Sequence, residues 1–144
     1  MGDVERVEAK SRQRAVLFYL MAAVLVLNVV VGFLPFPADP DPASPVLVTG
    51  FWLLMVALTL VNLLPIAPLR AGRLGALWND ETTQAHRRSS FAAGFWAAIA
   101  SASALAIVAT LHPLAGAGVA RIVITAALVA ALVSFATQEL RAAR

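Results

Sequence analysis

The sequence contains two histidines, His86 and His112, and no cysteine. A metal or haem site needs several ligands that converge on one point. The two histidines are 26 positions apart in the sequence, which is about 39 Å along the axis of one continuous helix. One chain therefore cannot bring both to the same metal ion, and we expect no metal and no cofactor.

Acid–base and nucleophilic chemistry is equally poorly supported. Asp39 and Asp41 lie in a segment with five prolines between Pro35 and Pro45. A proline-rich segment is stiff and extended, so we expect a solvated linker rather than a cation site. No glycine-rich phosphate loop or nucleophile elbow is present, and we expect a protein that is not an enzyme.

Two asparagines, Asn28 and Asn62, lie inside long apolar stretches. Counting 1.5 Å of rise per residue places Asn28 level with Trp52, and Asn62 level with Tyr19. We predict two polar layers, Asn28–Trp52 and Tyr19–Asn62, that join the first two apolar stretches. Interhelical hydrogen bonds in membranes contribute about 0.6–2 kcal/mol each. The alternative is that the asparagines line a path for a small solute or ion.

The composition indicates that lipid is the solvent of these stretches. Apolar residues make up 60% of the chain and charged residues 13%, with a mean hydropathy of +0.82. Soluble domains carry about 25% charged residues. The composition excludes a soluble enzyme, a disordered chain and a nucleic-acid-binding domain, although the isoelectric point is near 10.6.

Four apolar segments have the length of about 20 residues that a helix needs to cross a bilayer. They do not alternate as barrel strands do, and open sheet edges cannot face lipid. We predict an all-α, polytopic membrane protein, an antiparallel four-helix transmembrane bundle that forms a single membrane domain over residues 1–144. The expected spans are about 15–34, 46–66, 91–111 and 119–136, with a loop at 67–90.

The positive charges predict the orientation. Every Lys and Arg except Arg121 falls in the N-terminal arm, the 67–90 loop or the C-terminal tail. The positive-inside rule therefore places both termini and this loop in the cytoplasm, as in a multi-pass protein of the plasma (inner) membrane. Arg121 begins the fourth span on the other side, where we expect it to extend towards lipid phosphates. A role in an anion path is the alternative.

The third span is predicted to begin in the cytoplasm. Asn79 is a suitable N-cap, and nothing interrupts a helix from there to Pro113. Close to this start lie four charged residues that we expect to contact a partner or anionic lipid: Asp80, Glu81, Arg87 and Arg88.

Small residues recur at every fourth position of the third span: Gly94, Ala98, Ala102, Ala106 and Thr110. Small side chains let transmembrane helices approach closely. We predict that this stripe packs against the fourth span, with a homodimer interface as the alternative.

The segment from Trp78 to Trp96 resembles one found in small, uncharacterised prokaryotic four-span membrane proteins. In that family an Asp-Glu pair and basic residues, here Asp80-Glu81 and Arg87-Arg88, precede a third span rich in small residues. The resemblance implies the same architecture. We expect a non-catalytic scaffold or accessory subunit of a membrane complex, with a membrane protein or a second copy as its partner. The alternative is an oligomeric transporter or channel lined by Asn28 and Asn62.

Overall fold

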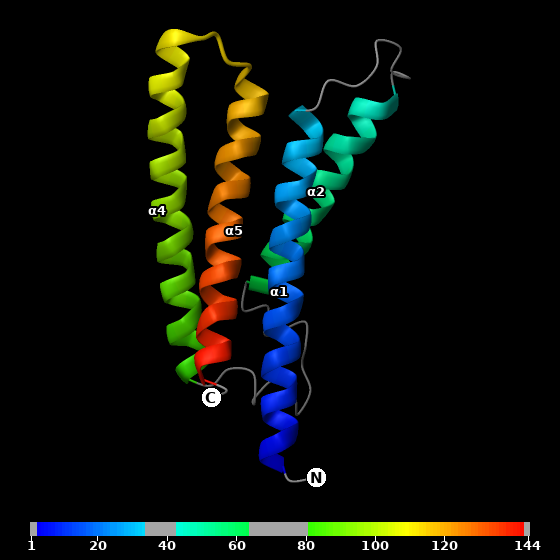
Figure 1. Ribbon diagram of the computed structural model, residues 1–144, viewed down its shortest axis with the longest axis vertical. Coiled ribbons are helices and arrows are strands. Elements are labelled where there is room, and N and C mark those ends of the chain that lie inside the picture. The colour runs from blue at the N-terminus through cyan, green and yellow to red at the C-terminus, as the bar shows by residue number, and fades with distance from the viewer. Residues whose placement is uncertain (1–2, 34–42, 64–80, 143–144) are drawn as a thin grey trace.

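The computed structural model describes residues 3–33, 43–63 and 81–142, with side chains described in 11–33, 46–63 and 84–142. These residues form four helices: α1 (Asp3–Phe33), α2 (Ala43–Leu63), α4 (Glu81–Leu111) and α5 (Gly116–Ala142). All four are long and apolar enough to cross a membrane. The predicted all-α four-helix bundle is confirmed (Figure 1).

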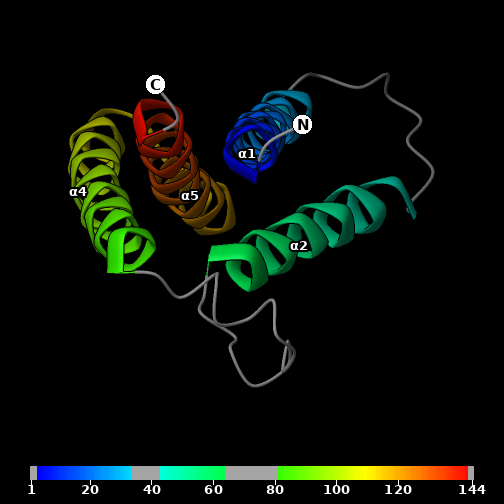
Figure 2. The ribbon, with the colours of Figure 1, turned by 90° about the horizontal axis from the view of Figure 1, so that it is seen from below.

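Helix α5 is the centre of the bundle. It packs along α4 on one side and along α1 on the other, and α2 contacts both α1 and α5. Seen along the bundle, α4, α5 and α1 stand in a row, and α2 lies obliquely across one side of it (Figure 2). Both chain ends lie at one end of the bundle (Figure 1), which we call the termini end. The opposite end, where residues 112–115 connect α4 to α5, is the loop end.

All four helices extend beyond the predicted spans. Helix α1 begins at Asp3 and α5 continues to Ala142, because their polar terminal segments contain no proline or glycine that would stop a helix. Helix α2 begins at Ala43 and includes Pro45 in its first turn, where the missing N–H of proline costs nothing. The expected extended linker therefore ends before residue 43, and residues 34–42 lie outside the described part.

Helix α4 begins at Glu81. Asn79, the predicted N-cap of the third span, lies outside the described residues. Residues 81–90 of the expected 67–90 loop are therefore helical, and 67–80 lie outside the description. The first turns of α4 do not stand alone. Ser90 is fully buried, and His86 lies beside Glu139 near the end of α5.

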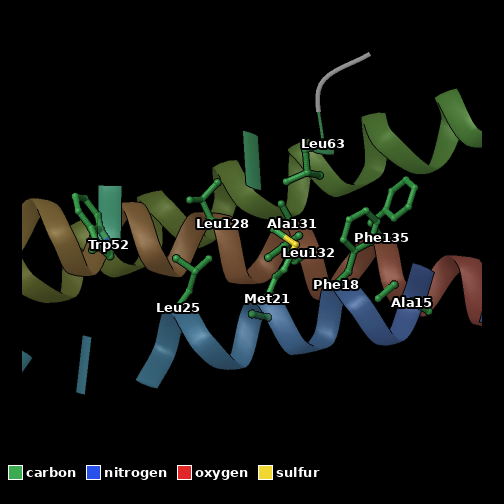
Figure 3. Packing of buried hydrophobic residues seen from close by; sticks show 12 residues of the cluster. Ala15, Phe18, Met21, Leu25, Trp52, Leu63, Leu128, Ala131, Leu132 and Phe135 are labelled. Atoms are coloured by element: carbon green, nitrogen blue, oxygen red, sulfur yellow. The ribbon is translucent and has the colours of Figure 1, made fainter. Parts of the chain in front are cut away.

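The core lies between α1 and α5 (Figure 3). Leu25 of α1 and Leu132 of α5 have no exposed surface, and the rings of Phe18 and Phe135 meet edge to face with centroids 5.1 Å apart. Outside this core, large apolar side chains face outwards, among them Trp96, which is 68% exposed. Water would penalise such a surface, whereas lipid does not.

The small-residue stripe meets α5 along part of its length only. At Gly94 a Cβ atom would lie 2.8 Å from the carbonyl oxygen of Ala127 and 3.3 Å from Cβ of Ala131. Ala102 and Ala106, by contrast, are exposed. A spacing of four residues drifts about 40° around a helix at each step. The predicted packing of the whole stripe is therefore corrected: its first members face α5, and the later ones turn away.

Candidate functional site

At the loop end, side chains from three helices form what we call the Arg121 cluster: Arg121 and Thr125 of α5, Asn28 and Gly32 of α1, and Trp52 of α2. Nη2 of Arg121 donates a hydrogen bond to Oδ1 of Asn28. The guanidinium carbon lies 5.6 Å from the centre of the Trp52 ring, within range of a cation–π interaction. The buried Trp52 Nε1 donates to Oγ1 of Thr125 at 3.0 Å. The cluster thus ties α1 and α2 to α5.

Gly32 makes room for the guanidinium. A Cβ atom at this position would lie 2.9 Å from Nη1 of Arg121 and 3.3 Å from the guanidinium carbon. Any larger residue would push the arginine side chain away from α1. Within the bundle the guanidinium of Arg121 lies across α1 and α2. The expected contact of Arg121 with lipid phosphates stays a prediction.

The charge of Arg121 has only uncharged neighbours among the described side chains. Its Nε atom is buried and has no hydrogen-bond partner in the described part of the chain. The one acidic residue whose side chain is described, Glu139, lies 18 positions further along α5, or about 27 Å. A charged side chain within a membrane costs about 2.5–3.5 kcal/mol at its centre and is retained mostly for function. Arg121 is therefore the strongest candidate for a ligand-binding side chain.

A second polar group, the Glu139 cluster, joins α1, α4 and α5 at the termini end. Glu139 is buried in the fold, with its side chain 10% exposed. Oγ of Ser11 donates to Oε2 of Glu139 at 2.9 Å and to its backbone oxygen at 3.2 Å. Nδ1 of His86 lies 3.9 Å from Oε1, which is too long for a hydrogen bond. This Nδ1 is buried and has no hydrogen-bond partner within residues 11–33, 46–63 and 84–142.

Glu139 was not among the predicted site residues because the fourth span was expected to end at 136. A signal for it does exist in the sequence. The buried residues Leu128, Leu132 and Phe135 recur at helical spacing, and Glu139 is the next position on that face. Extending the pattern past the first polar residues would have placed this carboxylate inside the bundle.

The polar contacts predicted between α1 and α2 are made to α5 instead. Oη of Tyr19 shares a hydrogen bond of 2.8 Å with Oγ1 of Thr137, on α5. The partners of Asn28 and Trp52, Arg121 and Thr125, also belong to α5. Depth along a helix can be counted from the sequence, but the direction in which a side chain points depends on which helix is central.

Asn62 makes its hydrogen bond within its own helix, from Nδ2 to the carbonyl oxygen of Leu58 at 2.8 Å. The two asparagines thus bond to different helices. Asn28 is close to the loop end of α1, and Asn62 is the last residue but one of α2.

The charged residues predicted to contact a partner are only partly described. Asp80 lies outside the described residues, and Glu81 is the first residue of α4. Arg88 is exposed and Arg87 is half-buried. Their contact with a partner or with anionic lipid stays a prediction.

His86 lies near the start of α4, and His112 directly follows the last residue of that helix. The described residues contain no group of three His, Cys, Asp or Glu that could hold a metal ion. No family model, curated protein or solved structure matches the chain. The function must therefore be inferred from the bundle itself.

Proposed function

We propose that this protein is a small, non-catalytic subunit of a membrane complex, and that α4 is the helix on which a membrane partner docks. The observation that carries the proposal is the one-sided packing of α4. Only 6% of its most apolar stretch is buried, compared with 28% for α5. Helix α4 packs chiefly on α5, so most of its circumference is open to a second protein or to lipid.

The open side of α4 includes a surface suited to helix association. Ala102, Ala106 and Thr110 are all exposed and lie along one side of the helix, beyond the point where the stripe leaves α5. Apolar side chains such as Ile107 and Leu111 flank them and are equally exposed. In a membrane, close packing at small residues drives association, because lipid is as apolar as leucine.

The polar residues support a structural role over the transporter alternative. Tyr19, Asn28, Trp52 and Asn62 all make hydrogen bonds to protein atoms. Three of these bonds join helices and one lies within a helix. The bond between Asn28 and Arg121 joins two helices, which supports a structural role for Asn28.

The test is the mass of the intact complex after purification in a mild detergent. The wild-type chain is expected to carry a stoichiometric foreign membrane subunit. The variant A102L/A106L should lose that subunit and keep its own thermal stability, because both positions are exposed. A104L is the matched control, since Ala104 is also exposed and points about 200° away from Ala102.

A pure homo-oligomer that supports solute flux in liposomes would contradict the proposal and favour the transporter. Equal loss of the partner from A102L/A106L and from A104L would also contradict it, because the docking surface would then not be the small-residue side of α4.

A further inference from the structure

We propose that the Arg121 cluster binds a phosphate group, either in a lipid headgroup or free in solution, at the loop end of the bundle. Arg121 lies five positions after Gly116, and Asn28 lies five positions before Phe33. Both are thus about 7.5 Å inside the ends of their helices. The Arg121 cluster thus lies close to the loop end, within reach of a ligand outside the bundle, and its positive charge has only neutral described neighbours.

Not every N–H group of the Arg121 guanidinium has a hydrogen-bond acceptor among the described residues. The guanidinium carries five N–H groups in a planar fork that matches the oxygens of a phosphate. Asn28 accepts from Nη2, and Nε has no acceptor in the described part of the chain. Arg121 is half-buried rather than enclosed, so the fork can be reached from outside the bundle. Because Nε itself is buried, a phosphate would meet the guanidinium at its Nη groups, where it would supply the missing negative charge.

The position of the fork is fixed from two sides. Trp52 of α2 lies against the guanidinium, and Gly32 of α1 leaves the space that it occupies. Asn28 holds one edge of the fork. A guanidinium held in place loses little conformational freedom when it binds, which favours an oxyanion over solvent.

The surroundings favour a phosphate that belongs to a lipid. Apolar side chains at this end of the bundle face outwards, with Phe33 58%, Val30 52% and Phe51 48% exposed. Acyl chains can pack on these side chains while the headgroup reaches Arg121. A small inorganic anion would gain nothing from them.

The experiment measures binding of two probes to the purified full-length chain in mild detergent. Native mass spectrometry reports bound dioleoyl-phosphatidylglycerol. In a W78F/W96F background, which leaves Trp52 as the one tryptophan, fluorescence reports inorganic phosphate. The wild-type chain should bind phosphatidylglycerol at least about tenfold more tightly than R121Q, in keeping with the strength of a charge-assisted hydrogen bond. A response to the lipid alone assigns the headgroup, and an equal response to inorganic phosphate assigns a soluble oxyanion.

Two further variants separate binding from folding. G32A keeps the charge but displaces the guanidinium from α1, and should weaken binding several-fold while the chain remains helical and monodisperse. R141Q removes one exposed arginine at the termini end and should bind both probes as the wild-type chain does. The proposal is overturned if R121Q and G32A bind as tightly as the wild-type chain, or if R141Q loses as much affinity as R121Q.

Discussion

Among single residues, Glu139 has the clearest structural role. A carboxylate withdrawn from water is costly unless hydrogen bonds satisfy it. Ser11 from α1 supplies a hydrogen bond at 2.9 Å, and His86 from α4 lies 3.9 Å away. A protonated imidazole at that distance would add an ion pair. One acidic side chain therefore links three helices at the termini end.

We expect E139A to lower the free energy of unfolding by about 1.5–3 kcal/mol, which is the range for hydrogen bonds to a charged group. S11A should cost about 1 kcal/mol. The double variant should cost less than the sum of the two, with a coupling energy of about 0.5–2 kcal/mol. Unfolding by denaturing detergent, followed by circular dichroism, measures all three values.

Arg141 provides the control for Glu139, since it lies on the same helix and is exposed. R141A should change the free energy of unfolding by less than about 0.5 kcal/mol. If E139A is no more destabilising than R141A, or if the effects of S11A and E139A simply add, the Glu139 cluster does not hold the helices together.

At the scale of the helix, Gly94 permits a close approach of α4 to α5. Gly94 has backbone and Cβ atoms of α5 within 2.8 and 3.3 Å of where its own Cβ would be. A backbone atom cannot give way as the end of a flexible side chain can. A residue larger than glycine must therefore separate the two helices locally.

G94A is expected to lower the free energy of unfolding by about 1–3 kcal/mol, as overpacking in a close-packed contact does. G50A is the matched control, because nothing lies within 4 Å of a Cβ at that position of α2. The same change there should be neutral or stabilising by up to about 1 kcal/mol, since alanine favours a helix over glycine. Thermal unfolding of both variants in one detergent makes the comparison, and equal stability would contradict the close approach at Gly94.

The sequence predicts where the helices lie along the chain, but it does not predict which helices pack against one another. Length and hydropathy place four spans, and Asn79 predicts the start of α4, because these are local properties. The partners of Tyr19, Asn28 and Trp52 are not local. They depend on α5 lying between α4 and α1, and hydropathy does not encode that order, since lipid and protein are equally apolar neighbours. The burial of Glu139 is not predicted for a related reason. The predicted fourth span ends at 136, whereas α5 continues to Ala142.

At the scale of the whole molecule, an apolar exterior surrounds a core that is mostly confined to α1 and α5. The polar clusters lie near the two ends and not in the middle. Such an exterior fits a multi-pass membrane protein whose sides are covered by lipid.

The four-span topology is tested most directly by the accessibility of single cysteines to a membrane-impermeant thiol reagent in intact cells. The chain has no cysteine of its own, so each variant reports one position. H112C, at the loop end, should react in intact cells, whereas R12C and R141C, at the termini end, should react only after the membrane is opened. If only one of R12C and R141C reacts in intact cells, the four-span bundle is contradicted. If both react in intact cells and H112C does not, the predicted orientation is contradicted.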